Sequence, residues 1–424
     1  MSPDCESRQR VCAEVIVRVG LNLQPGQRLL IAEPYELQGV CREANALVEA
    51  VGTAALAAGC PQPEIIWGDA PRLRQYAEQA DWHGFARLVA AQAHRMQDHL
   101  AAGGAFLFPI SSFPRLLDGI AAEQVSELRQ IAWKHFGPIV QRLTRGESQW
   151  TLVPAPSPAW ADAAFADRPP ARRLDALKDT VFAAMRIPAA QGALCPEPPQ
   201  AKSTPAASAL AAWQTHLTSL QRQRAGLNER RHKFIRYQGP GTDLTVRLPA
   251  QHHWCTAQLT TQGGLTFVAN LPTEEVFTAP ERNSAEGTVR VSRPVNYGGA
   301  VMEGIELEFH QGRVVRARAR TGGDLLRQVL DTDDGSCRLG EVAMVENGLA
   351  DLLPDPAPAE QKPSPPDWQN TGRLFYHTLL DENASNHIAL GESYPFCNRS
   401  LFGFGLNRSL VHVDLPLDAR AALA

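Results

Sequence analysis

The sequence lacks an excess of charge of either sign. It holds 41 Lys and Arg against 45 Asp and Glu, a formal net charge of −4, and the basic residues are interspersed with acidic ones. Such a chain exerts no long-range attraction on nucleic acid or on an acidic membrane surface. No run of 18 or more apolar residues is present, so we expect no membrane span. We therefore predict neither a nucleic-acid partner nor a membrane partner.

Closely spaced cysteine pairs and a secretory signal are also missing. The eight cysteines are scattered without a CxxC spacing, which argues against a structural zinc cluster. The N-terminus carries acidic residues and leads into an amphipathic helix instead of a signal peptide. We expect reduced thiols in a cytoplasmic protein. The content of 44% hydrophobic and 20% charged residues is typical of a globular protein.

Short apolar segments alternate with helical patterns through the first half of the chain. We expect strands at 28–32, 64–67, 105–109 and 150–153, and helices at 8–20, 38–58, 71–102 and 123–143. Strands separated by helices indicate a parallel sheet that is covered on both faces. The proline-rich segment 188–208 then interrupts the pattern and is typical of a surface loop or linker.

In the second half of the chain, short strands separated by turns replace the alternation of helices and strands. After a helix at 207–227, short strands are expected at 234–237, 243–248, 265–269, 287–292, 304–309 and 313–319. His310-Gln-Gly312 is a plausible hairpin turn, a helix is expected at 323–330, and a second proline-rich insert spans 353–366. At 424 residues the chain exceeds one ordinary core. We predict an α/β protein with an N-terminal α/β domain (1–205), built on a parallel sheet, and a C-terminal β-rich α+β catalytic domain (206–424).

Residues that can bind metal gather near the end of the sequence. His412 and Asp414 alternate with Val411 and Val413 in an expected strand, so both polar side chains lie on one face. His387 follows an acidic run that can also cap a helix. A His-x-Asp pair is a weak signal by itself, and His387 alone could be an ordinary surface residue. The metal-binding interpretation of these residues is stronger because other candidate ligands accompany them.

Carboxylates and a tyrosine complete the set. Glu274 and Glu275 follow a turn-forming segment, where adjacent glutamates are usually solvated. Glu341 precedes an apolar strand, and a carboxylate buried there needs a partner or a metal. Tyr394 could belong to the site or to the core. Several carboxylates, two imidazoles and one phenol meet the needs of a hydrolytic two-metal site, so a metallohydrolase is the leading hypothesis.

Five ordered motifs resemble those of the aminopeptidase T family of thermophilic metalloaminopeptidases. They are Tyr237–Leu244, Asn270–Pro280, Leu339–Ala343, Leu380–Gly391 and Asn407–Asp414. Weaker similarity extends over the N-terminal half. The resemblance implies peptide substrates with a free N-terminus, a homodimer, and two divalent ions, which are zinc or cobalt with manganese as a further option.

The resemblance also assigns roles to single residues. It implies Glu275, Glu341, His387, His412 and Asp414 as the metal ligands. Tyr394 is implied as the catalytic tyrosine. Of the two adjacent glutamates, the resemblance favours Glu275 as the metal ligand, with Glu274 as the alternative. A glutamate that is not fully engaged in ligation, Glu274 or Glu341, is the candidate for proton transfer.

Two alternatives stay open. The first is a mononuclear iron(II) ring-cleaving dioxygenase, an enzyme class whose fold is similar to the one expected here. His387, His412 and Asp414 match the two histidines and one carboxylate that bind iron in such enzymes. In that case Glu275 and Glu341 have no clear role. A non-catalytic peptide-binding relative is the second alternative, because relatives generally continue after the last motif with a further β-structured tail.

Overall fold

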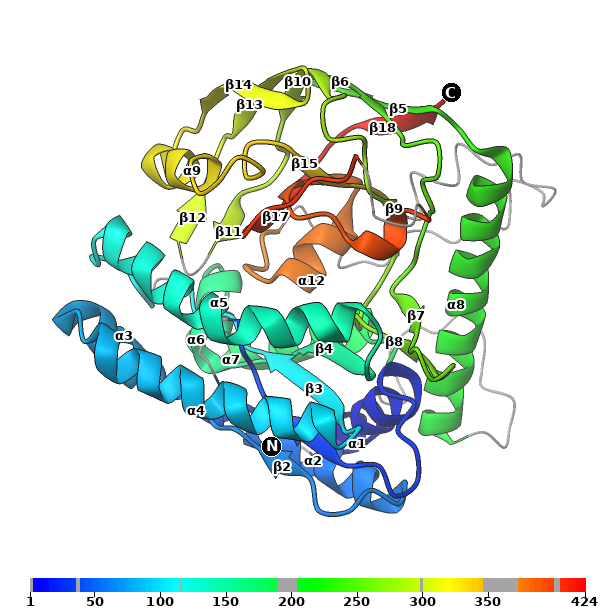
Figure 1. The fold of residues 1–424 in the computed structure, drawn as a ribbon. Coiled ribbons are helices and arrows are strands. Elements are labelled where there is room, and N and C mark those ends of the chain that lie inside the picture. Colours follow the sequence, from blue (N-terminus) through cyan, green and yellow to red (C-terminus); the bar gives the residue numbers. More distant parts are fainter. Residues whose placement is uncertain are drawn as a thin grey trace. The chain divides into compact units, whose positions relative to one another are not determined.

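The computed structural model describes residues 3–35, 39–114, 116–188, 204–297, 300–345, 373–399 and 405–424. The chain forms two compact units (Figure 1): Met1–His216 with Gln258–Pro272, and Leu217–Ala257 with Thr273–Ala424. The proline-rich insert 353–366 and most of 188–208 lie outside the described residues. Among the helices of the described ranges, none is both long and apolar enough to cross a membrane.

The first unit is built on a parallel sheet. Its strands β1 (Leu29–Ile31), β2 (Glu64–Ile65), β3 (Ala105–Ile110) and β4 (Trp150–Pro154) lie in the order β2-β1-β3-β4. Every pair in this sheet is parallel. All residues of β1 and β3 are buried, as expected for strands covered on both faces. The predicted α/β character of this half is confirmed.

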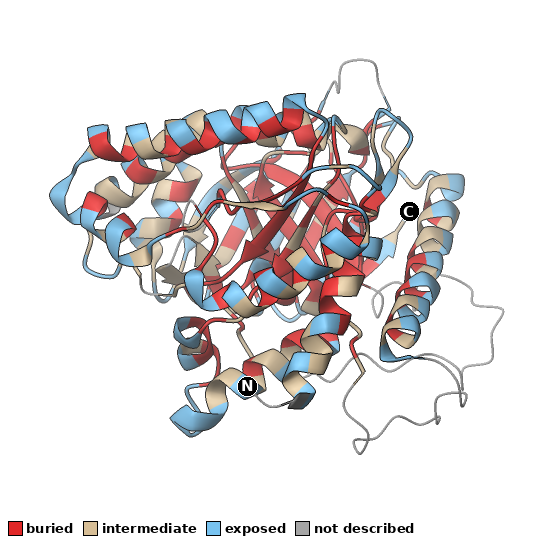
Figure 2. Cartoon of the chain, turned by 90° about the horizontal axis from the view of Figure 1, so that it is seen from below, coloured by how far each residue is buried: buried red, intermediate tan, exposed pale blue. Residues whose placement is uncertain are grey.

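Helices precede, separate and follow these strands. They are α1 (Pro3–Val15), α2 (Asn45–Ala57), α3 (Ala70–Gln79), α4 (Trp82–Ala101), α5 (Ala122–Thr144), α6 (Pro158–Ala164) and α7 (Pro170–Ala184). Their buried residues follow one side and their exposed residues the other (Figure 2). The helices α6 and α7 were not predicted from the sequence. Each begins with proline, which favours the first helical position, and the Ser157 side chain accepts a hydrogen bond from the Trp160 amide at the start of α6. A hairpin of β7 (Gln258–Thr260) and β8 (Thr266–Val268) also belongs to this unit.

A six-stranded antiparallel sheet dominates the second unit. It contains β5 (Phe234–Gly239), β6 (Thr242–Arg247), β10 (Glu286–Arg290), β13 (Glu306–His310), β14 (Arg313–Arg318) and β18 (Arg420–Leu423), in the order β14-β13-β10-β6-β5-β18. Gln311 and Gly312 join β13 to β14 with φ of 48° and 77°. Two positive φ values match the predicted hairpin turn. The residues after Asp414 return to this sheet, where β18 pairs with β5.

A four-stranded antiparallel sheet carries the candidate site. It consists of β9 (Glu275–Thr278), β15 (Leu339–Val345), β16 (His387–Gly391) and β17 (His412–Pro416), in the order β17-β16-β15-β9. Alternate residues such as Val276, Met344 and Leu415 share one buried core with residues of the six-stranded sheet, including Ile235 and Val246. Because the side-chain period of a strand is two, the intervening residues face the opposite side.

The remaining elements of this region are short, except for one helix. They are α8 (Pro205–Arg230), β11 (Val295–Tyr297), β12 (Ala300–Met302), α9 (Gly323–Leu330), α12 (Thr378–Asp381) and the 3-10 turns η4 (Glu382–Ala384) and η5 (Pro395–Cys397). The helices predicted at 207–227 and 323–330 correspond to α8 and α9. Of these elements, α12, η4 and η5 flank the candidate site in sequence.

Candidate metal centre

The predicted ligands occupy neighbouring strands of the four-stranded sheet. Glu275 begins β9, Glu341 lies in β15, His387 begins β16, and β17 carries both His412 and Asp414. Their register brings them together, since His387 pairs with Ala343, two residues beyond Glu341, and Asp414 pairs with Ala389, two residues beyond His387. Residues two apart on a strand share a face. The ladder thus places five residues from distant sequence positions on one side of the sheet.

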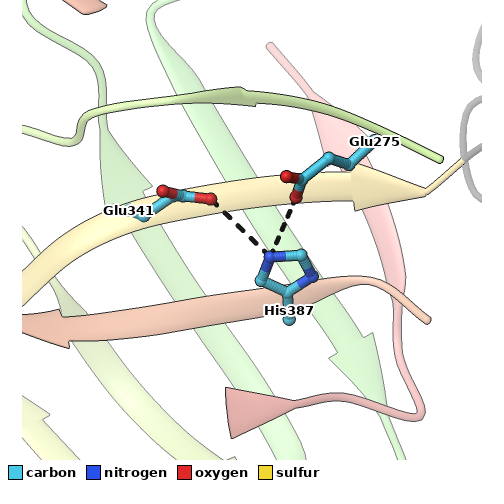
Figure 3. A group of neighbouring side chains, drawn as sticks. All are labelled: Glu275, Glu341 and His387. Carbon is cyan, nitrogen blue, oxygen red and sulfur yellow. Dashed lines mark ion pairs between the residues drawn. The ribbon is translucent and has the colours of Figure 1, made fainter. Parts of the chain in front are cut away.

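Glu275, Glu341 and His387 form a first, fully buried group (Figure 3). Nε2 of His387 lies 3.0 Å from Oε2 of Glu275 and 3.6 Å from Oε1 of Glu341. One ligand atom from each residue lies within 4.8 Å of the other two. Among the described residues, Oε2 of Glu275 is buried and has no hydrogen bond of good geometry. Buried carboxylate oxygens need a partner, and ligand atoms converging in this way suit a cation.

His412 and Asp414 form a second group beside the first. Nε2 of His412 lies 3.4 Å from Oδ1 of Asp414 and 3.8 Å from Oε2 of Glu341. Glu341 therefore turns one oxygen toward each imidazole, Oε1 to His387 and Oε2 to His412. A carboxylate placed in this way can belong to two ligand sets at once.

Backbone carbonyl groups orient both imidazoles. Nδ1 of His412 lies 2.9 Å from the carbonyl oxygen of Glu392, and Nδ1 of His387 lies 3.3 Å from that of Ser385. A carbonyl oxygen can only accept, so each Nδ1 carries the proton that is donated. The Nε2 atoms, which point to the carboxylates, are then free to act as ligands in the neutral imidazole.

The electrostatics of the site favour a cation. Burial raises the pKa of Glu341, and the charge of Glu275 adds to this effect, while His387 opposes it. Burial by itself would lower the pKa of His412, but the charge of Asp414 raises that pKa to about 9. The carboxylates thus repel one another and draw protons onto neighbouring groups, as expected where acidic groups exceed the positive charge available. Divalent ions would relieve this repulsion.

Glu382 lies at the candidate site, although no sequence pattern singled it out. It is buried in η4, and its pKa is raised well above the usual value by burial and by the charges of Asp414 and Glu275. The run Asp381-Glu-Asn was read as a possible helix cap. Asp381 does serve the backbone, because its carboxylate accepts from the amides of Phe375 and His377 at 2.8 and 3.0 Å. The next residue, Glu382, interacts electrostatically with Asp414 and Glu275 of the candidate site instead.

Tyr394 and Glu274 occupy different surroundings. The ring of Tyr394 lies 5.2 Å from that of His412 and stacks on Phe396 at 5.3 Å, which places its phenol ring beside the second group. Glu274 is buried, and its amide donates to Oδ1 of Asn383 at 2.6 Å. The contact with His387 is made by its neighbour Glu275.

Comparison with known proteins identifies the family of the chain. Residues 6–352 and 361–422 match the sequence pattern of the thermophilic metalloproteases (M29). The chain belongs to this family. Aminopeptidase T of Thermus thermophilus is 35% identical to this M29 chain, over 95% of the chain and 90% of the relative. Aminopeptidase AmpS of Bacillus subtilis is 31% identical, over 96% of this chain and 92% of AmpS.

A solved structure extends the comparison to the fold. Wild-type AmpT from Thermus thermophilus superposes on this M29 protein with a TM-score of 0.81 at 33% identity, covering 98% of this chain and 97% of AmpT. The resemblance inferred from the five motifs is confirmed. The protein is a metal-dependent aminopeptidase, a hydrolase that acts on peptides.

Proposed function

We propose that the enzyme removes N-terminal residues from peptides by means of two divalent ions. The main support is the position of Glu341, whose two carboxylate oxygens face two different imidazoles at 3.6 and 3.8 Å. One ion would be held by Glu275, Glu341 and His387. The other would be held by Glu341, His412 and Asp414, with Glu382 adjoining. The mixed nitrogen and oxygen donors suit zinc, cobalt or manganese.

The chain's own residues would divide the remaining tasks. When bound, the ions would supply an acidified water and polarise the scissile carbonyl. Tyr394, whose ring lies beside His412, would donate a hydrogen bond to the oxygen that gains negative charge in the transition state. Because Glu341 points both oxygens at imidazoles, we assign proton transfer to Glu274. The free amino group of a peptide would bind among these carboxylates, which would restrict cleavage to the N-terminal bond.

The proposal also covers the oligomeric state and the cellular location of the enzyme. We propose a homodimer that acts in the cytoplasm. Analytical ultracentrifugation of the purified protein tests the first part, and a sedimentation coefficient matching a single chain contradicts it. The iron(II) dioxygenase alternative is less well supported, because both Glu275 and Glu341 contact His387 and would serve no purpose in a site with one carboxylate.

Metal reconstitution tests the proposal. The protein is stripped with a chelator and reloaded with zinc, cobalt, manganese or iron(II), and hydrolysis of leucyl-p-nitroanilide and of a tripeptide is followed. We expect two ions per chain and release of the N-terminal residue. Glu341→Gln should lose both ions and activity, whereas Glu308→Gln, an exposed glutamate of β13, should keep both. A single bound ion in the active enzyme, or oxygen uptake with iron and no hydrolysis, would contradict the proposal.

A further inference from the structure

Thr378 lies against two acidic groups of the site although it is itself exposed. Its hydroxyl is 3.1 Å from Oδ2 of Asp414 and 3.3 Å from Oε2 of Glu382. Thr378 begins α12, and Glu382 comes four residues later, so the two side chains can lie on the same side of this helical turn. Asp414 comes from β17. A single hydroxyl therefore joins the helical turn to the strand that carries His412 and Asp414.

Burial does not force the Thr378 hydroxyl into contact with Asp414 and Glu382, because Thr378 is exposed. An exposed threonine can satisfy its hydroxyl with water, yet this one lies between the carboxyl groups of Asp414 and Glu382. A hydroxyl offers one hydrogen and two lone pairs, so it can donate to one carboxylate while its oxygen stays next to the other. A hydroxyl in this place can therefore bridge Asp414 and Glu382.

We propose that Thr378 is a positioning residue that holds Asp414 and Glu382 in place for the ion on the His412 side of the site. This inference rests on the two-ion function proposed above. Thr378 acts through the two carboxylates. Groups that orient metal ligands typically contribute about 10- to 100-fold to metal affinity or activity. The ion beside Glu275 and His387 should depend much less on Thr378, because the Thr378 hydroxyl contacts Asp414 and Glu382.

Three substitutions separate this role from a general effect on folding. Thr378→Val keeps the shape and removes the hydroxyl, and Thr378→Ser keeps the hydroxyl. Thr332→Val is the matched control, because Thr332 is an exposed threonine of the same unit whose hydroxyl donates to the backbone carbonyl of Gln328. Circular dichroism and thermal unfolding establish that each variant folds.

Cobalt binding to the chelator-stripped protein provides the measurement. Calorimetry gives the two affinities, and the visible absorption spectrum reports the geometry around each ion. We expect Thr378→Val to weaken one of the two sites by about 10- to 100-fold and to change its spectrum, with the other site unaffected. Thr378→Ser should restore both properties, and Thr332→Val should match the wild type.

The outcomes distinguish this inference from the function on which it rests. If the wild type binds two ions and Thr378→Val binds both as tightly with the same spectrum, the role of Thr378 is refuted and the two-ion site stands. If Thr378→Ser is as impaired as Thr378→Val, the hydroxyl is not responsible and the inference is also refuted. If the wild type binds one ion, the two-ion function fails, and the role of Thr378 fails with it.

Discussion

Divalent metal should stabilise the second unit much more than the first. All the candidate ligands belong to the second unit, where the carboxylates of Glu275, Glu341, Glu382 and Asp414 surround two imidazoles. Even with both imidazoles protonated, negative charge exceeds positive charge when all four acids are ionised. Metal binding relieves this repulsion in the folded state, and the unfolded chain has no such cluster. Binding free energy therefore becomes folding free energy.

The size of the effect follows from linkage. At a free metal concentration of 100 times the dissociation constant, each site adds about 2.7 kcal/mol, so two sites add roughly 5 kcal/mol. A domain of this size gains about 2–4 °C in melting temperature per kcal/mol, which predicts a rise of roughly 10–20 °C. The raised pKa values of Glu341, Glu382 and His412 set the pH dependence. Metal must displace protons from these groups, so stabilisation should be weaker at pH 5 than at pH 7.

Thermal unfolding and hydrogen–deuterium exchange can measure this effect. With added metal, amides of β15 and β16 should exchange more slowly, whereas amides of β3 in the first unit should change little. Glu341→Gln, which lacks the shared carboxylate, should respond weakly to metal. Equal protection of β3 and β15, or an unchanged melting temperature at metal concentrations that saturate activity, would refute the reasoning.

Two further predictions concern single residues next to the ligands. Tyr394→Phe should lower turnover by about 10²- to 10³-fold, because it removes a donor to the transition state, while metal content stays at the wild-type level; equal losses of metal and turnover in a metal analysis would contradict this role. Gly340→Ala should lose about 1–3 kcal/mol of stability through overpacking and bind less metal, because its Cβ would lie 2.3 Å from the carbonyl oxygen of Glu392. Gly52→Ala, with nothing within 4 Å of the added Cβ, is the control in denaturant unfolding; equal stability of both variants would count against the prediction.

Local sequence patterns were sufficient for much of the fold. Apolar runs such as Ala105–Pro109 predicted the parallel strands, because a strand buried on both faces needs apolar residues throughout. Alternation in Val411–Asp414 predicted that His412 and Asp414 share a face, and their side chains lie 3.4 Å apart. The helices α6 and α7 were not predicted, and each begins with proline, a residue with opposite meanings at the first position and in the interior of a helix.

The assembly of the site required information that local patterns do not contain. Motif resemblance selected Glu275, Glu341 and His387, but no local signal shows that strand register places them within one group of ligand atoms. Glu382 was missed because an acidic run before a histidine also describes a helix cap. The path of the chain from α12 to β16 determines that Asp381 accepts hydrogen bonds from the backbone and that Glu382 faces the candidate site.

The alternation of core and site residues along β15 has a consequence for evolution. Val342 and Met344 pack in the core, and Glu341 between Gly340 and Val342 faces the ligands. A slip of one residue in a strand exchanges its two faces, so it would move Glu341 into the apolar layer and Val342 among the carboxylates. Insertions or deletions of one residue in this strand should therefore destroy hydrolysis and folding together. Selection for activity thus also preserves the strand pairing of the enzyme.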